Sequence, residues 1–285
     1  MYLRQPSERT YAVPGLNIAG KYWPGDDSKT PIIALHGWLD NCASFDRLIP
    51  YIPNTVLALD TAGHGLSGRR SPDSYYNIWQ DIGEVLHIAD QLGWEKFHLL
   101  GHSRGAIIGT LAATTFPERI ENLLLVDGFW VFPIDADKIV EQMRSGITDK
   151  YALLDREPRY YSSYEAAVAA RISQGRIPLQ AKEAAVLAVR GVSQNEKGFY
   201  WNNDPRLRGA SEMKLTYEQT EHFISKLTTP GVMVLAKSSF LTKIETFQKV
   251  LKQIKSLDVV YVEGNHHLHM DDQVTEVATA LQPYL

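Results

Sequence analysis

One stretch of the chain places a serine in the local structure that makes serine a nucleophile. The segment GHSRG at residues 101–105 follows an apolar run, Phe97–Leu100, that predicts a buried strand, and it precedes Ala106–Ala113, which predicts a helix. A sharp turn from strand to helix strains the serine backbone, and the glycines let the two elements pass close by. Backbone N–H groups at the helix N-terminus would face a developing oxyanion. The segment therefore predicts Ser103 as a nucleophile.

Three histidines near the end of the chain are candidates for the base that Ser103 needs. A serine hydroxyl is unreactive at neutral pH unless an adjacent base takes its proton. His266, His267 and His269 follow an apolar run, Val259–Val262, that predicts a late strand. The residue types alone leave open which of the three is the base.

Polar side chains follow the predicted strands at the points where the strands end. Short, unbroken apolar runs at residues 31–35, 56–59, 97–100, 123–126, 232–235 and 259–262 alternate with helical segments at 75–92, 241–254 and 274–281, while 11–23 predicts an opening hairpin and 45–49 a short helix. This alternation predicts a parallel sheet covered on both faces. Because the carboxyl ends of parallel strands share one edge, where ligands bind, we expect five residues to meet there. They are His36, Asp60, Ser103, Asp127 and His266.

The interval from Phe129 to Ser225 breaks this rhythm. It has helical stretches at 135–145, 164–173, 180–189 and 217–226 and no buried strand of the same kind. We interpret residues 130–225 as a helical cap, or lid, inserted into a core formed by residues 1–129 and 226–285. Within it, Asp204 and Arg206 are expected to form an ion pair.

Composition narrows the class of protein. A chain of 285 residues fits one domain with an insertion, and its net charge of −4 offers no electrostatic reason to expect nucleic acid or an anionic membrane as a partner. Cys42 is the only cysteine, which excludes an intrachain disulfide and fits a cytoplasmic protein. Neither a signal peptide nor an apolar run of about 18 residues is present, so no membrane insertion is expected. No zinc-type spacing of Cys and His occurs, and we expect neither a metal nor a cofactor.

Five motifs, in this order and spacing, resemble the α/β-hydrolase superfamily, and in particular its serine hydrolase-like (Kraken-like) subgroup. They are HGWLDN at 36–41, DxxGHGxS at 60–67, GHSRG at 101–105, WxxDPRL at 201–207 and GxHxLH at 264–269. The resemblance covers nearly the whole chain. It implies an α/β-hydrolase fold, with a mostly parallel central sheet flanked by helices and an inserted helical lid.

The resemblance also implies a catalytic triad. His266, two residues after Gly264, matches the family's catalytic histidine, with His267 as the alternative and His269 in a supporting role. The usual acid position, after the strand at 232–235, reads AKSSF at 236–240 and has no carboxylate. The family's second acid position follows the strand after the nucleophile, where this chain has Asp127, 24 residues beyond Ser103 as in haloalkane dehalogenases. We predict Ser103, His266 and Asp127 as the triad.

Two backbone N–H groups complete the expected site. The resemblance implies that Trp38 and Arg104 donate them to the oxyanion. The Arg104 side chain is unusual beside the nucleophile and is expected to face solvent; an acidic substrate or a carboxylate of the lid is the alternative partner. His36 and Asp60 are expected to tie neighbouring loops together without taking part in chemistry.

The predicted function is a metal-free serine hydrolase that acts on a small-molecule carboxylic ester, with amides and thioesters less favoured. Haloalkane dehalogenase and epoxide hydrolase chemistry is excluded, because it needs a carboxylate where Ser103 stands. Two alternatives stay open: a lyase or perhydrolase that uses the same triad, and a ligand-binding protein with negligible turnover.

Overall fold

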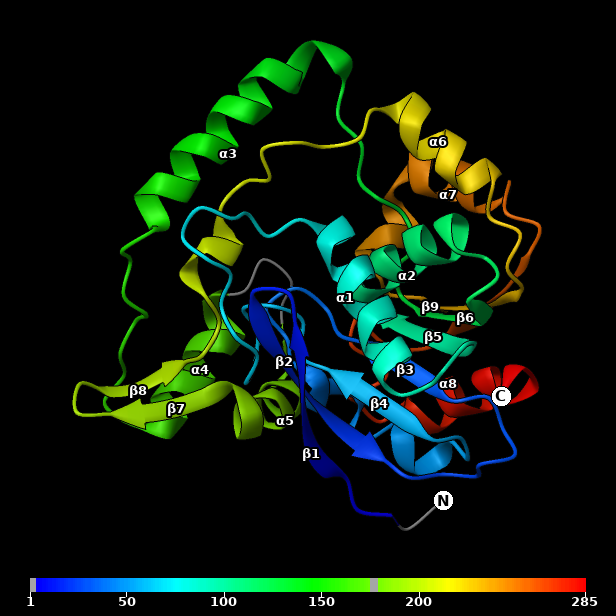
Figure 1. Cartoon of the computed structure of the whole chain (residues 1–285), viewed down its shortest axis with the longest axis horizontal. Coiled ribbons are helices and arrows are strands. Elements are labelled where there is room, and N and C mark those ends of the chain that lie inside the picture. Colours follow the sequence, from blue (N-terminus) through cyan, green and yellow to red (C-terminus); the bar gives the residue numbers. More distant parts are fainter. Residues whose placement is uncertain (1–3, 175–178) are drawn as a thin grey trace.

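An eight-stranded sheet runs through the middle of the molecule (Figure 1). The computed structural model describes residues 4–174 and 179–285. The strand order is β1-β2-β4-β3-β5-β6-β9-β10. β1 and β2 form an antiparallel hairpin, and β2 pairs antiparallel with β4. The six strands β4, β3, β5, β6, β9 and β10 pair in parallel in that spatial order. The strands are β1 (Ser7–Val13), β2 (Leu16–Trp23), β3 (Ile32–Leu35), β4 (Val56–Leu59), β5 (Phe97–His102), β6 (Ile120–Val126), β9 (Gly231–Ala236) and β10 (Leu257–Val262).

Alternate residues of each buried strand face opposite sides of the sheet, and each side has its own apolar core. On one side Leu99 and Met233 pack with α1 (Ile78–Gln91), α2 (Arg104–Thr115) and α7 (Glu245–Leu251). On the other, Leu100 and Val232 pack with α8 (Val274–Leu281). This period of two is what a strand buried on both faces requires. The predicted α/β architecture is confirmed.

Most of the predicted helices and strands are present, and the prediction for residues 45–49 is wrong. The opening hairpin is present, and the predicted helix at 274–281 is α8. The helix expected at 45–49 is not continuous: its ends belong to two separate 3-10 turns, Cys42–Phe45 and Ile49–Tyr51, with a non-helical turn between them. Pro50 explains the difference, because proline has no N–H to donate and disfavours the α conformation in the residue before it.

Residues 130–225 lie between β6 and β9 in the chain. They form α3 (Ile139–Leu153), α4 (Tyr164–Gln174), α5 (Ala181–Gly191), a hairpin of β7 (Val192–Asn195) and β8 (Gly198–Trp201), and α6 (Tyr217–Ser225). The small hairpin was not expected; its strands are half-exposed and stand outside the main sheet, so they lack the apolar run of a buried strand. We call residues 130–225 the inserted segment.

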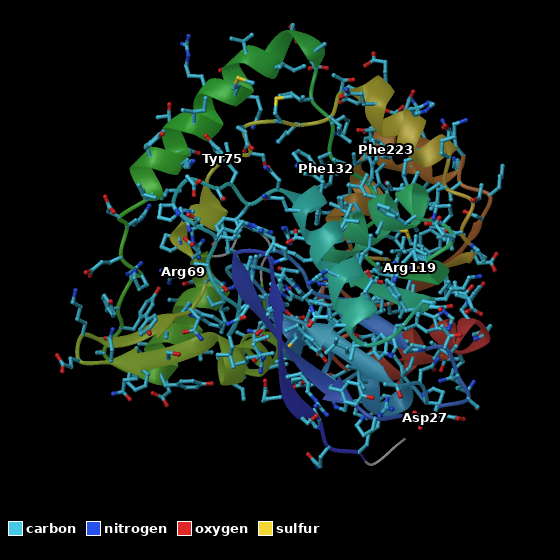
Figure 2. All side chains as sticks on the ribbon, in the orientation of Figure 1. Asp27, Arg69, Tyr75, Arg119, Phe132 and Phe223 are labelled. Atoms are coloured by element: carbon cyan, nitrogen blue, oxygen red, sulfur yellow. The ribbon has the colours of Figure 1, made fainter. Side chains whose placement is uncertain are left out.

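The elements of the inserted segment lie in two separate parts of the molecule. In Figure 1, α3 and the β7–β8 hairpin lie on the side of the molecule opposite α8, whereas α6 packs on α2. Figure 2 shows Phe223 of α6 above the helices on that face, where it packs against their apolar core. No helix in the described ranges is both long enough and apolar enough to cross a membrane.

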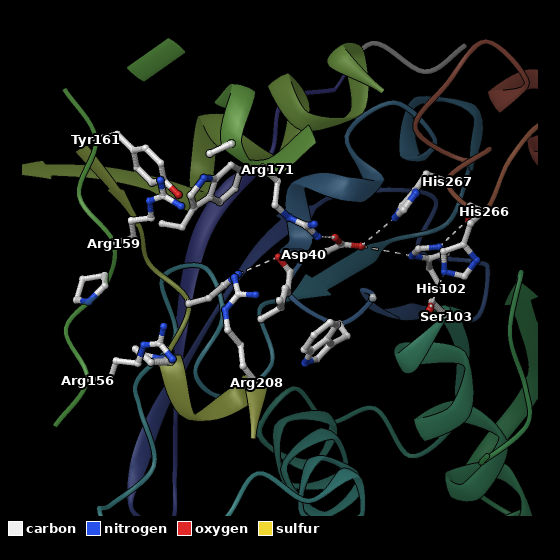
Figure 3. Close-up of a pocket in the computed structure, with 18 of the residues that line it drawn as sticks. Asp40, His102, Ser103, Arg156, Arg159, Tyr161, Arg171, Arg208, His266 and His267 are labelled. Carbon is white, nitrogen blue, oxygen red and sulfur yellow. Dashed lines mark hydrogen bonds and ion pairs between the residues drawn. The ribbon is translucent and has the colours of Figure 1, made fainter. Parts of the chain in front are cut away.

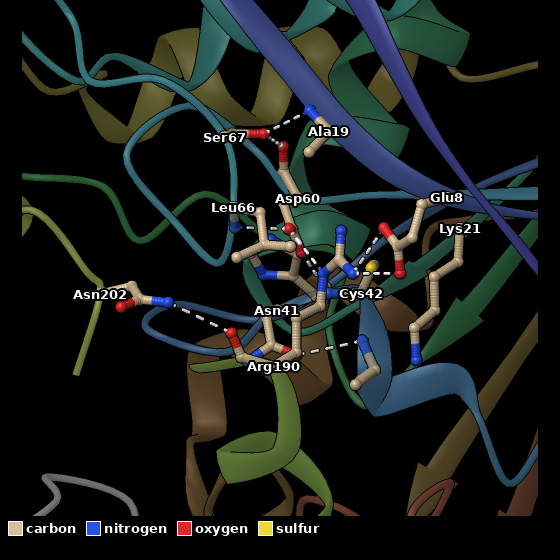
Figure 4. Close-up of polar contacts among 12 residues, drawn as sticks. Glu8, Ala19, Lys21, Asn41, Cys42, Asp60, Leu66, Ser67, Arg190 and Asn202 are labelled. Atoms are coloured by element: carbon tan, nitrogen blue, oxygen red, sulfur yellow. Dashed lines mark hydrogen bonds and ion pairs between the residues drawn. The ribbon is translucent and has the colours of Figure 1, made fainter. Parts of the chain in front are cut away.

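A buried arginine of the inserted segment fastens α5 to the core (Figure 4). The Arg190 Nε donates to the Asp60 carboxylate at 2.7 Å, and its Nη1 donates to Glu8 at 2.7 Å. Asp60 also accepts the backbone N–H groups of Cys42 and Leu66, both at 2.8 Å. Asp60 therefore ties two rim loops and α5 together, in line with the structural role expected for it.

The Arg190–Asp60 pair gives a test of this attachment. Arg190→Gln leaves the fully buried Asp60 carboxylate without its cation, and breaking such a pair costs about 3 kcal/mol of unfolding free energy. Urea unfolding measures the change. Lys249→Gln, which removes the exposed pair with Glu245, is the matched control and leaves the midpoint unchanged. Equal midpoints for the two variants would show that the buried pair does not hold α5.

Candidate active site

The turn between β5 and α2 holds Ser103 in a strained backbone conformation. Its φ of +51° lies in the left-handed region, which a side chain normally avoids. The close packing that enforces the turn is visible at two glycines. A Cβ on Gly101 would lie 2.5 Å from the Gly105 carbonyl oxygen, and one on Gly105 would lie 1.9 Å from the Leu35 carbonyl oxygen. These contacts leave no room for side chains, so the predicted turn is present and tight.

Ser103, His266 and Asp127 form one unbroken chain of hydrogen bonds. The His266 Nε2 lies 2.9 Å from the Ser103 hydroxyl, and its Nδ1 lies 2.6 Å from an Asp127 carboxylate oxygen. The carboxylate only accepts, so Nδ1 carries the proton and Nε2 is left to accept from the serine. The structure thus brings together the three residues that the sequence singled out, from the ends of β5, β6 and β10.

The Asp127 carboxylate is fixed by donors from the end of β9. Asp127 is fully buried with a φ of +45°, and its oxygens accept from the Ala236 N–H at 2.9 Å and the Ser239 hydroxyl at 2.6 Å. Sequence reasoning noted that residues 236–240 lack a carboxylate but did not identify Ser239. Ser239 belongs to the segment in which the family's usual acid would lie, and the missing carboxylate there was the signal that could have found it.

His267 points away from the serine. Its ring lies 3.9 Å from the Asp40 carboxylate and 3.8 Å from that of Glu183. Burial lowers the pKa of His267 well below the ordinary value, so the ring is neutral. Of the two histidines weighed as the base, the structure places His266 against Ser103.

The third histidine of the cluster, His269, is also buried and packs on His102 and Phe45. Burial lowers the pKa of His269 well below normal. His102, from the end of β5, has its Nε2 2.9 Å from the His266 carbonyl oxygen, so its N–H donates there and steadies the loop that carries His266.

The imidazoles of His102, His266 and His267 form a group whose nitrogens lie within 4.8 Å of one another. Such a group resembles a metal site, but both ring nitrogens of His266 are already engaged, with Ser103 and Asp127. A metal bound through His266 would have to displace one of these partners. The residues therefore fit proton transfer better than metal ligation.

Trp38 lies in the loop after β3 and lines the same cavity as Ser103. Its indole N–H donates to the Leu207 carbonyl oxygen at 2.9 Å, which joins this loop to the inserted segment. In the same loop, His36 accepts the N–H of Thr61 from the neighbouring loop after β4 at 3.0 Å, the loop-tying role expected for it. Asp204 and Arg206 form the expected ion pair, at 2.8 Å.

The expectation for the Arg104 side chain is wrong. Instead of facing solvent, the side chain is only 12% exposed and pairs with Asp81. Asp81 lies on the buried face of α1, where Arg70 also approaches it at 3.5 Å. The partner comes from a helix 23 residues earlier in the chain, so only the packing of α1 against α2 brings the two together.

A cavity of about 450 Å³ opens in front of Ser103 (Figure 3). The core contributes residues of three loops, at 37–40, 102–103 and 266–267. The inserted segment contributes the opposite wall, including four arginines that sequence reasoning missed: Arg156, Arg159, Arg171 and Arg208. They are scattered over more than fifty residues and form no local motif.

Comparison with known proteins agrees with this fold and site. A family model described as alpha/beta hydrolase fold matches residues 30–273, and the chain belongs to that family. Serine hydrolase-like protein 2 of Homo sapiens is 31% identical over 304 aligned residues, covering 98% of this chain and 94% of that protein. A probable serine hydrolase of Drosophila melanogaster is 30% identical, covering 92% and 83%. A crystal structure of a hypothetical protein from Pseudomonas aeruginosa PAO1 is 35% identical, with a TM-score of 0.92 over 97% of this chain and 98% of that one.

The resemblance to serine hydrolase-like proteins is thereby confirmed, and it supports hydrolase activity in general.

The tight turn predicts a large effect of one methyl group. Gly105→Ala forces its Cβ into the Leu35 carbonyl and lowers the unfolding free energy by about 2–3 kcal/mol. Gly83→Ala is the matched control: its Cβ meets nothing within 4 Å, and alanine in a helix stabilises by about 0.5–1 kcal/mol. Urea unfolding of both variants measures the difference, and a Gly105→Ala protein of unchanged stability would contradict the close approach.

The Ser239–Asp127 hydrogen bond predicts a second effect. Ser239→Ala removes a donor from a fully buried carboxylate and lowers the unfolding free energy by about 2 kcal/mol, as loss of a hydrogen bond to a charged group does. Ser238→Ala, at the exposed neighbouring position, is expected to change it by less than about 0.5 kcal/mol. Identical urea midpoints for the two variants would show that Ser239 does not stabilise Asp127.

Proposed function

We propose that this protein is a serine hydrolase that cleaves carboxylic esters of small molecules through an acyl-serine intermediate. The observation that carries the proposal is the hydrogen-bond chain from Asp127 through His266 to Ser103, at a strained turn that opens on a cavity. Amides and thioesters, which react by the same acyl transfer, are further candidate substrates.

In the proposed mechanism the Ser103 oxygen attacks the ester carbonyl carbon while its proton moves to the His266 Nε2. The backbone N–H groups of Trp38 and Arg104 hold the tetrahedral oxyanion. The intermediate collapses, and His266 returns the proton to the departing alcohol. Water then attacks the acyl-serine by the same route and releases the acid.

In this mechanism Asp127 positions His266 and stabilises its positive charge. Its carboxylate accepts the Nδ1–H, which keeps Nε2 free of a proton and directed at the serine. Its own position is held by Ala236 and Ser239, so the imidazole has a fixed support.

We further propose that residues 130–225 act as a cap that bounds the substrate cavity. Arg156, Trp201 and Arg208 from this segment line the cavity that Ser103 and Trp38 line from the core. The anchors at Arg190 and Leu207 hold the segment over the carboxyl edge of the sheet.

The test is covalent labelling with a fluorophosphonate, which reacts only with an activated serine. The wild-type protein is expected to label at Ser103, as mapped by mass spectrometry. Ser103→Ala abolishes labelling, and His266→Ala and Asp127→Asn each slow it by about 10³-fold. His87→Ala, an exposed histidine on α1, is the matched control and labels at the wild-type rate.

Each departure from this pattern has a distinct meaning. Labelling that is unaffected by Asp127→Asn would remove Asp127 from the triad. A folded wild-type protein that does not label would overturn the proposal in favour of a ligand-binding protein without turnover. Products from an ester substrate other than its acid and its alcohol would indicate a lyase or perhydrolase.

A further inference from the structure

The cavity in front of Ser103 has an excess of positive charge. Four arginines line it against two carboxylates, Asp40 and Glu157. The chain as a whole carries a net charge of −4, so this excess is a local feature and not a consequence of composition. In Figure 3 the labelled arginines lie on the side of the cavity away from Ser103, with Asp40 between them and the histidines.

Both carboxylates already have partners. Asp40 lies 3.4 Å from the Arg171 guanidinium, and burial, which would raise its pKa, is outweighed by His102, His267 and Arg171, which lower the pKa well below normal. Glu157 pairs with Lys197 at 2.6 Å. Within the described residues, neither carboxylate forms an ion pair with Arg156 or Arg208.

The positive charges of Arg208 and Arg156 are not balanced by a neighbouring carboxylate. Within residues 4–174 and 179–285, neither guanidinium has a carboxylate within 4.0 Å. Burial, together with repulsion from Arg171 and Arg156, lowers the pKa of the Arg208 guanidinium, which nevertheless stays protonated at neutral pH. Holding like charges together costs free energy, and a bound anion would recover it.

The geometry around Ser103 also decides where a large substrate group lies. A second cavity beside Ser103 is lined by phenylalanines, among them Phe129 and Phe240, and holds only about 20 Å³, close to the room of one water molecule. Of these two cavities beside Ser103, only the arginine-lined one has room for a group larger than a methyl.

We propose that the substrate carries an anionic oxygen group, a carboxylate or a phosphate, remote from the scissile carbonyl and bound by Arg208 and Arg156. This inference rests on the proposed hydrolase function and specifies its substrate class. Guanidinium groups match both anions because their paired N–H donors fit two oxygens at once. The positive wall also attracts an anionic substrate from solution into the cavity, although the protein as a whole has a negative net charge.

The experiment compares three p-nitrophenyl esters of equal chain length. The far end is a carboxylate in mono-p-nitrophenyl suberate, a methyl ester in its neutral match and a phosphonate in the third. For the wild-type protein we expect kcat/KM for at least one anionic ester to exceed that for the neutral ester by about tenfold or more. Added salt at 0.5 M reduces this ratio by screening.

Variants assign the preference to the two arginines. Arg208→Gln and Arg156→Gln each reduce the anionic-to-neutral ratio of kcat/KM by about fivefold or more, while thermal unfolding verifies that each variant is folded. Both side chains are exposed, so neither substitution leaves a cavity in the core, and the two variants test the idea independently. Arg144→Gln, which removes an exposed arginine of α3 outside the cavity, is the matched control and leaves the ratio unchanged.

The outcomes separate the two proposals. A ratio near one in a wild-type protein that still labels at Ser103, or a ratio unaffected by both variants, overturns the anionic substrate while the hydrolase function stands. A wild-type protein that neither labels nor turns over any ester overturns the hydrolase function and this inference with it. Preference for the suberate supports a carboxylate-bearing substrate, and preference for the phosphonate supports a phosphate-bearing one.

Discussion

The close approach of α2 to strands β3 and β5 is the constraint on which the site depends. The Gly105 Cα lies against the Leu35 carbonyl, and Gly101 lies against the Gly105 backbone, so the chain can leave β5 only through a turn that forces a positive φ on Ser103. The turn projects the hydroxyl beyond the sheet edge and places the N-terminus of α2 directly behind it. Strain in the serine backbone is stored there because packing on both sides leaves no relaxed alternative.

A second constraint is the division of labour between the ends of β6 and β9. The carboxylate comes from β6, as Asp127, and β9 supplies the N–H and hydroxyl groups that hold it. β6 and β9 are hydrogen-bonded neighbours, so a carboxylate at the end of either strand can reach the same side of the histidine. The imidazole therefore meets an anchored carboxylate although residues 236–240, after β9, contain none.

The inserted segment contributes polar anchors and charge. Arg190 and the Leu207 carbonyl join it to the rim loops of the core, and its arginines turn one wall of the cavity positive. The catalytic machinery that we propose comes wholly from the core, whereas the character of the substrate cavity comes largely from the insertion. Such a division lets one reaction serve different substrates, since the cavity wall can change without disturbing the chain from Asp127 to Ser103.

The sequence by itself determined the sheet, its covering helices and the residues at the strand ends, because apolar periodicity and the glycines of a sharp turn act over a few neighbouring residues. It also singled out Ser103, Asp127 and His266. Only the tertiary structure decided that His266 rather than His267 faces the serine, that Ser239 holds Asp127, that Arg104 turns inward to Asp81, and that four distant arginines share one wall. These contacts join elements far apart in the chain, so they depend on how the helices and loops pack in three dimensions and leave no local pattern.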